Sequence, residues 1–160
     1  MVTDETGIRP SLEESIRLGQ RLEDILLEET RAIESREPDR LQAAVQRKQE
    51  LLQALETETR KQQQWIEARG AEFTPEGVAR LFARLEGGEH LNDRWQALRA
   101  TIERCNELNQ GNARLIERNQ RRVQMSMQIL RGEDNGPATT YDPYGKARHR
   151  RTTGQTITRA

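Results

Sequence analysis

The sequence predicts an all-α protein, an elongated antiparallel hairpin or bundle of three to four helices with a disordered C-terminal tail. Composition is the first reason: the 160 residues are 33% hydrophobic, 32% charged and 4% aromatic, with many residues that favour helix over sheet. The second is the spacing of apolar residues, which alternates between three and four over long stretches. So low a share of apolar residues is sufficient for apolar stripes between helices but not for a thick hydrophobic core.

The first helix is predicted over residues 11–35. Pro10 suits the entry to a helix, and Ser11 followed by Glu14 has the spacing of a capping box, in which both side chains bond free N–H groups of the first turn. The helix ends before Pro38, because proline disfavours helical conformation in the preceding residue. Its apolar positions at helical spacing are Leu18, Leu22, Ile25, Leu26 and Ile33.

The second helix is predicted over residues 38–69, because proline is tolerated in a first helical turn. Gly70 is placed to form its C-terminal cap. The stripe expected to contact other helices becomes polar toward its end. It consists of Leu41, Val45, Lys48, Leu52, Leu55, Thr59, Gln62 and Ile66.

A short third helix is predicted over residues 75–86. Thr74 can cap it, and Pro75 fits its first turn. Two consecutive glycines, Gly87 and Gly88, then end the helix or bend the chain sharply. One face is apolar, with Leu81, Phe82 and Leu85.

The fourth helix is the longest, predicted over residues 89–131, because no proline interrupts this stretch. Gly111 lies inside it and costs about 1 kcal/mol relative to alanine, which a close helix approach or a kink would explain. The contact stripe consists of Leu91, Trp95, Leu98, Ile102, Cys105, Asn109, Asn112, Ile116, Asn119, Val123, Ser126 and Leu130.

Three asparagines, Asn109, Asn112 and Asn119, occupy positions of this stripe where apolar residues are expected. A polar residue in a helix contact often fixes its register, but one is normally enough. The alternative is a face that is not permanently covered, where amides bond water or a partner and can adapt to varied side chains. Both interpretations remain open from the residues alone.

The residues predict neither an enzyme nor a metal or cofactor site. The two histidines, His90 and His149, lie in unrelated contexts, and no phosphate-binding or dinucleotide-binding glycine motif occurs. Cys105, the single cysteine, lies on the stripe as a small core residue and fits a reducing compartment. No apolar run is long enough for a membrane span and no secretory signal is seen, so we expect a cytoplasmic protein.

We expect two regions, a helical domain over residues 1–135 and a flexible basic tail over residues 136–160. The tail has five basic residues against Asp142, a net charge of +4, and its proline, glycine and threonine content supports no packed element. Such a tail can touch nucleic acid or anionic lipid, but without a folded platform a solvated extension or protein-docking peptide is at least as good an interpretation. We therefore expect neither a nucleic-acid partner nor a membrane span.

Four sequence motifs follow one another along the chain: "REPDRLQAAVQRKQELLQALE", "CNELNQGNARLIERNQ", "QILRG" and "TYDPYGK". Their order and spacing resemble the FlgN family of flagellar type III export chaperones, over roughly residues 12–160. Members of that family are all-helical, cytoplasmic and non-enzymatic. They keep the hook–filament junction proteins FlgK and FlgL export-competent and deliver them to the cytoplasmic domain of the export-gate protein FlhA.

The resemblance also implies roles for particular residues. Tyr141 corresponds to the tyrosine that docks on the export gate, and the nearby Tyr144 is a second candidate. An alternative is that Tyr141 folds back onto the end of the last helix, near Met127 or Leu130. The implied client-binding residues are Asn109, Asn112, Leu115, Ile116, Asn119 and Val123.

Two other functions remain open from the residues. One is a structural coiled-coil protein whose asparagines set the register of a homo-oligomer. The other is a nucleic-acid or membrane accessory that acts through its basic tail, whose binding would weaken steeply with salt.

Overall fold

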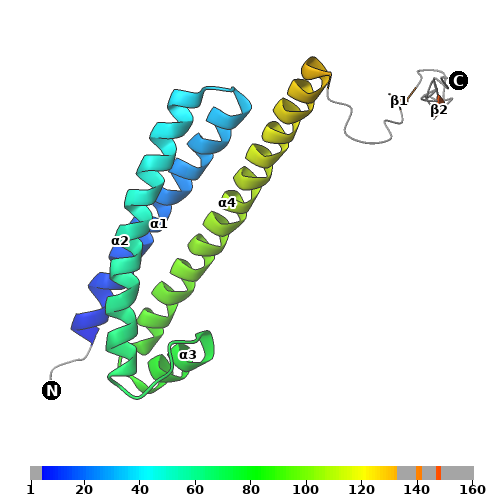
Figure 1. Ribbon diagram of the computed structural model, residues 1–160. Coiled ribbons are helices and arrows are strands. Elements are labelled where there is room, and N and C mark those ends of the chain that lie inside the picture. Colours follow the sequence, from blue (N-terminus) through cyan, green and yellow to red (C-terminus); the bar gives the residue numbers. More distant parts are fainter. Residues whose placement is uncertain (1–4, 133–139, 142–146, 149–160) are drawn as a thin grey trace, which may run out of the picture. The chain divides into compact units, whose positions relative to one another are not determined.

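The computed structural model describes residues 5–132, 140–141 and 147–148. Four helices make up most of this part, and they confirm the predicted all-α class (Figure 1). They are α1 (Glu5–Glu34), α2 (Pro38–Glu67), α3 (Pro75–Arg84) and α4 (Gly88–Arg131). The chain divides into two units, Met1–Arg118 and Asn119–Ala160, and the clusters and grooves described below belong to the first.

In the tail, two short strands are described, β1 (Thr140–Tyr141) and β2 (Ala147–Arg148). They pair antiparallel, with Thr140 opposite Arg148 and Tyr141 opposite Ala147. These four residues differ from the expected absence of regular structure, since backbone pairing needs no apolar core. The rest of the predicted disordered tail lies outside the described residues.

The start of α1 differs from the prediction. The helix begins at Glu5, so Pro10 lies inside it and Ser11 is not its N-cap. Proline there removes one helix hydrogen bond. Burial compensates, because Ile8 and Leu12 are both 0% exposed and the turn before Pro10 carries the first of them into the core.

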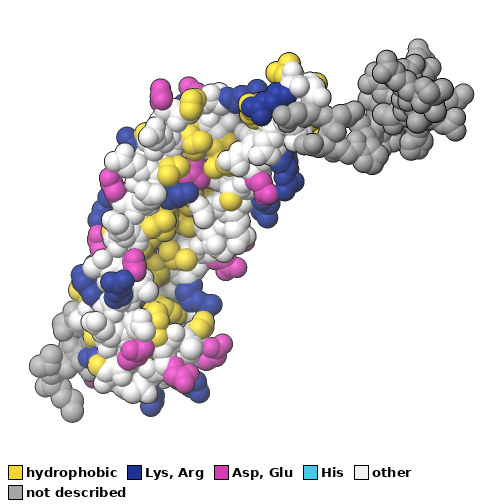
Figure 2. Space-filling view, viewed as in Figure 1, with side chains coloured by type: hydrophobic (Ala, Val, Ile, Leu, Met, Phe, Trp, Pro, Cys, Tyr) yellow, Lys and Arg dark blue, Asp and Glu magenta, His cyan; other side chains and the backbone are white. Residues whose placement is uncertain are grey.

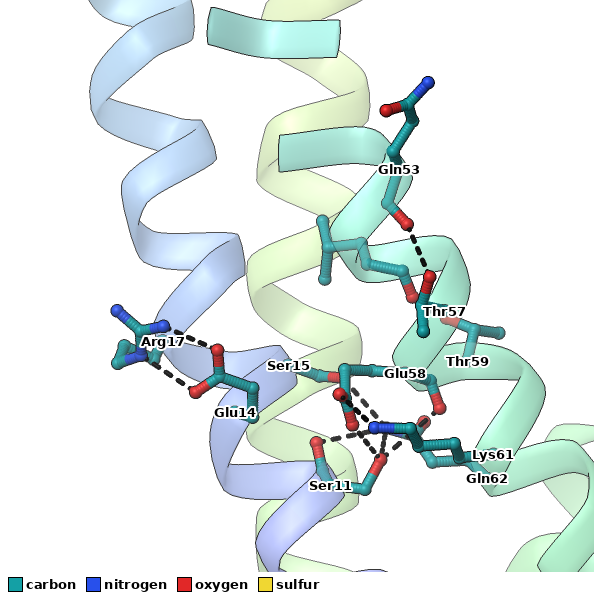
Figure 3. A network of polar contacts seen from close by, with 11 residues as sticks. Ser11, Glu14, Ser15, Arg17, Gln53, Thr57, Glu58, Thr59, Lys61 and Gln62 are labelled. Carbon is teal, nitrogen blue, oxygen red and sulfur yellow. Dashed lines mark hydrogen bonds and ion pairs between the residues drawn. The ribbon is translucent and has the colours of Figure 1, made fainter. Parts of the chain in front are cut away.

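Ser11 instead takes part in a polar network that joins α1 to α2 (Figure 3). Its hydroxyl donates to Glu58 Oε2 at 2.7 Å. Gln62, a buried residue of α2, donates from Nε2 to Ser15 Oγ at 2.8 Å and to Ser11 Oγ at 3.1 Å. Buried polar groups that are hydrogen-bonded in this way avoid the cost of an unmet partner and fix the register of the two helices.

The turn between α1 and α2 is a compact C-terminal cap. Arg36 adopts a left-handed conformation with φ of 54°, and the next residue, Glu37, donates its N–H to Ala32 O at 3.0 Å. This pattern satisfies carbonyls at the end of α1. Residues 34–40 are all exposed, so the tip of the hairpin buries none of its side chains.

The apolar core consists of two clusters. The four-helix cluster has residues of all four helices, and Phe73 packs edge-on against its Trp95 at 5.8 Å between ring centroids. The three-helix cluster has no residue of α3. The four-helix cluster is Ile8, Leu12, Ile66, Val78, Leu81, Phe82, Leu91, Trp95 and Leu98; the three-helix cluster is Leu18, Leu22, Leu26, Leu51, Leu55 and Cys105.

The loops around α3 follow the sequence prediction closely. Thr74 caps the helix, since its hydroxyl accepts from Gly77 N at 3.0 Å. Gly70 and Gly87 both have left-handed φ, of 76° and 75°. A side chain at Gly88 would collide with the carbonyl oxygen of Phe82, so α4 can start this close to α3 only with glycine.

The predicted contact stripes are wrong at several positions. In α2 the buried residues include Ala44 and Leu51, whereas Leu52 is 47% exposed. In α4 Thr101 is buried and Ile102 is 39% exposed. The physical reason in α4 is a close approach to α1 at Gly19, where a Cβ would lie 3.0 Å from Thr101 Cγ2. Because Gly19 has no side chain, Thr101 can pack directly against α1, and this side of α4 faces α1.

Candidate functional site

A groove of about 560 Å³ runs between α2 and α4, and α1 forms its floor. We call it the α2/α4 groove. It exists because α1 packs closely on α2, whereas α4 approaches both of these helices less closely. Hydrophobic side chains gather in the hollow between these helices in Figure 2. The apolar lining consists of Leu22, Leu26, Leu52, Leu55, Ile102 and Cys105.

Lys48 spans the α2/α4 groove. Its Nζ lies 2.8 Å from Glu29 Oε2 and donates to Asn109 Oδ1 at 3.1 Å, so one ammonium joins α2 to both α1 and α4. Glu29 is 1% exposed, and this ion pair balances its buried charge, although its Oε2 accepts no hydrogen bond within the described residues. Asn109 itself is exposed and forms part of the groove wall.

Asn112 belongs to α4, and its side chain is buried against α1 rather than exposed on an open face. It is 2% exposed, and its Nδ2 donates to Leu26 O at 2.9 Å and to Glu29 Oε1 at 3.1 Å. The Thr30 hydroxyl donates to Asn112 Oδ1 at 2.6 Å. Every polar atom of this amide therefore has a partner in α1, and Asn112 fixes α4 on α1.

A second groove of about 590 Å³ lies between α1 and α4, on the other flank of α4. We call it the α1/α4 groove. Leu27 of α1 is 40% exposed there, and Leu108 and Leu115 of α4 are half-buried. Gly111 and Asn112 also line it, and charged side chains surround it: Glu23, Arg104, Glu107, Arg114 and Arg118.

The remaining residues implied by the resemblance lie farther along α4. Ile116 and Asn119 are half-buried, and Val123 is 59% exposed. The side chain of Tyr141 and the whole of Tyr144 lie outside the described residues. Four other large apolar side chains near the end of α4 are exposed, namely Met125, Met127, Ile129 and Leu130.

The described residues offer little reactive chemistry. Burial raises the pKa of the Cys105 thiol to about 11, helped by the Glu23 carboxylate, so the thiol is protonated and poorly nucleophilic at neutral pH. His90 is exposed. Within the described part of the chain, no three His, Cys, Asp or Glu residues are grouped to hold a metal ion. None of the described helices has the length and apolar character to cross a membrane.

Sequence reasoning missed two lining residues, Leu52 and Ile102, because it placed both in helix contacts. The available signal was the pair of adjacent large apolar residues Leu51–Leu52, since neighbours in a helix point about 100° apart and cannot face the same partner. One of the two must face another surface.

Comparisons with known proteins agree on one family. The family model described as "FlgN protein" matches residues 5–149. The chain is also similar to the crystal structure, at 1.48 Å resolution, of a flagella synthesis protein FlgN from Pseudomonas aeruginosa. That match has 30% sequence identity and a TM-score of 0.67, and it covers 72% of this chain and 90% of the other. No curated protein matches the chain.

Proposed function

The chain belongs to the FlgN family, and from this we propose that it is a cytoplasmic, non-enzymatic flagellar export chaperone whose α2/α4 groove holds a client helix. The single observation that supports this best is the pair Leu52 and Ile102, large apolar side chains left 47% and 39% exposed on facing walls of one groove. Covering such surface yields about 25 cal/mol per Å². An amphipathic helix is the element whose apolar stripe fits between two helices.

The polar wall of the groove suits reversible binding. Asn109 and Asn106 line it beside the apolar floor, and amides can bond water when the groove is empty and a partner when it is filled. We propose that Ile116, Asn119 and Val123 of α4 also contact the client. Asn112 holds α4 on α1, and Leu115 lies in the α1/α4 groove.

The clients we propose are the hook–filament junction proteins FlgK and FlgL, whose C-terminal helices the chain keeps export-competent. A structural coiled coil is the alternative. Asn112 supports it in part, because its bonds to α1 set register. However, these bonds lie within one chain, so they account for one asparagine without requiring a homo-oligomer.

The test replaces the two groove residues together, Leu52→Ala and Ile102→Ala. We expect the affinity for FlgK and FlgL C-terminal segments to fall by a factor of ten or more, since each residue acts as a buried anchor in the complex. Isothermal titration calorimetry gives the affinity, and circular dichroism checks that the free variant stays helical.

Leu27→Ala is the matched control, because Leu27 is 40% exposed but lies in the α1/α4 groove. It should bind these clients as the wild type does. A folded double variant with unchanged client affinity would show that the α2/α4 groove does not bind the client. Concentration-dependent self-association that needs Leu52 and Ile102 would favour the structural coiled coil instead.

We further propose that Tyr141 docks the loaded chaperone on FlhA, with Tyr144 as the second candidate. A tyrosine in a polar segment offers a large apolar body and one hydroxyl, which suits a short docking peptide. Tyr141→Ala should abolish binding to the FlhA cytoplasmic domain and leave client affinity unchanged, and Tyr144→Ala should do less. Normal FlhA binding by Tyr141→Ala in a pull-down would refute this role, and loss of client binding would favour packing of Tyr141 on the helix.

A further inference from the structure

The α1/α4 groove is a second apolar surface, separate from the one assigned to the client. Its apolar residues come from two helices: Leu27 from α1, and Leu108 and Leu115 from α4. They lie on the flank of α4 opposite to Ile102 and Asn109, so one helix bound in the α2/α4 groove does not cover them. Client binding in the α2/α4 groove therefore does not explain why the apolar residues of the α1/α4 groove are partly exposed.

Gly111 is the most informative residue of the groove. It lies inside the continuous helix α4, where glycine destabilises the helix relative to alanine. A Cβ built at this position meets nothing within 4 Å, and the other conformational use of glycine, a left-handed φ, does not occur here. The folded chain thus gains nothing from glycine at this point, in contrast to Gly88, where a side chain would collide with Phe82.

A missing side chain on an exposed helix flank lets another backbone approach closely. Interaxial distances between packed helices depend on the side chains at the contact, and small residues give the shortest. Gly111 lies one turn from each of Leu108 and Leu115, so apolar side chains stand on either side of the gap. The arrangement fits one helix crossing α4 at Gly111.

The charges around the groove indicate the chemistry of that helix. Arg104 is paired with Glu23, at 3.2 Å between Arg104 Nε and Glu23 Oε1. Arg114 and Arg118 are exposed and form no ion pair within the described ranges of the chain, and with the equally exposed and unpaired Glu107 they leave a net charge of +1 beside the groove. The two arginines lie one turn apart on the same side of α4, beside the apolar residues, and would face the flank of a bound helix.

We propose that the α1/α4 groove binds an amphipathic helix of a partner protein that packs against Gly111 and carries acidic residues on the flank facing Arg114 and Arg118. The apolar stripe of this helix covers Leu27, Leu108 and Leu115. Its carboxylates pair with the two guanidinium groups, which supply specificity and faster association more than raw affinity.

The experiment uses two synthetic helical peptides as probes. Both carry the same leucine stripe, and one has glutamate and the other lysine along its flanks. Fluorescence anisotropy of labelled peptides with the full chain measures affinity. We expect the glutamate peptide to bind at least tenfold more tightly, and amide chemical shifts to change around Leu108, Gly111 and Leu115. Equal affinity for both peptides, or no saturable binding of the glutamate peptide, overturns the proposal.

Gly111→Ala and Gly111→Leu separate binding from folding. Alanine should raise the melting temperature of the free chain by about 3 °C, because it favours helix and fits the open space. Both variants should bind the glutamate peptide more weakly, and leucine should lower affinity about tenfold or more. A Gly111→Leu chain that binds as the wild type does would overturn the proposal.

Two further variants locate the peptide. Replacing Arg114 and Arg118 by glutamine should remove most of the preference for the glutamate peptide without changing the melting temperature. The Leu52→Ala and Ile102→Ala variant should bind this peptide normally, although it loses the junction-protein clients. If instead it loses the glutamate peptide and Gly111→Leu keeps it, the peptide occupies the α2/α4 groove and the proposed second surface is wrong.

Discussion

The four-helix cluster and the three-helix cluster are built on the same three long helices, yet only the first is closed. At the first, α3 supplies Val78, Leu81 and Phe82, and the last of these is 1% exposed. At the second, no element of the described chain covers the space between α2 and α4, so Leu52 and Ile102 remain partly exposed. The difference suggests that a short amphipathic helix completes the packing at one end, and that a partner's helix can do the same at the other.

The four-helix cluster therefore contributes mainly to folding stability, whereas the open groove beside the three-helix cluster remains available for binding. Phe82 is already removed from water in the free chain, so its burial contributes to folding. The exposed parts of Leu52 and Ile102 contribute nothing to folding, and their burial remains available to a partner. Substitutions that test this division should have large effects on folding in the four-helix cluster and small ones at the groove.

The largest effect is expected for Phe82→Ala. Removing this buried aromatic ring leaves a cavity in the four-helix cluster. The close contact of Gly88 with the Phe82 backbone limits how far α3 and α4 can move to fill it, and such changes cost about 3–5 kcal/mol. Urea unfolding followed by circular dichroism gives the free energy. The matched change at the groove, Leu52→Ala, should cost less than about 1 kcal/mol. Equal losses at the two sites would contradict the division.

A smaller loss is expected for Asn112→Ala. The change removes the amide donor of Glu29 Oε1, and an unmet buried group costs about 1–3 kcal/mol, whereas the Leu26 carbonyl still accepts from the Thr30 hydroxyl. Asn109→Ala is the control, because Asn109 is exposed and accepts a hydrogen bond from Lys48 at the surface; we expect a loss below about 0.5 kcal/mol. If the two variants unfold at the same urea concentration, Asn112 does not fix α4 as we infer.

The last effect concerns Cys105 and is absent at neutral pH. Burial raises the pKa of this thiol from 9.0 to about 11 in the folded chain, so the unfolded chain loses the proton first. The stability contributed by the neutral thiol is complete below pH 9 and is lost as the pH rises toward about 11. The difference in unfolding free energy between wild type and Cys105→Ala should therefore shrink over that range. A difference that does not vary with pH would contradict the buried position.

The helices could be predicted from the sequence because their boundaries depend on local chemistry. Pro38, Thr74 and Pro75 mark helix starts, and Gly70 and Gly87 mark ends, whatever the rest of the chain does. The start of α1 was mispredicted because it depends on Ile8 reaching a core made by distant residues. Local signals at Pro10 and Ser11 could not reveal that burial.

The groove could not be predicted because apolar spacing does not distinguish a covered side chain from one awaiting a partner. Leu52 and Ile102 fit the three-and-four spacing, and the sequence placed both in contacts within the chain. The orientation of Ile102 depends on the approach of α4 to α1 at Gly19, which is a tertiary feature. Similarly, the three asparagines look equivalent in the sequence, and only packing separates the buried Asn112 from the exposed Asn109.

The left-handed Arg36 at the tip of the α1–α2 hairpin has a practical consequence for protein engineering. Residues 34–40 bury none of their side chains, and insertions at exposed tips with little buried backbone are well tolerated. Arginine also gains nothing sterically from a φ of 54°, so glycine would fit this turn at least as well. The tip is therefore a suitable position for a fluorophore or a surface tether that leaves both grooves untouched.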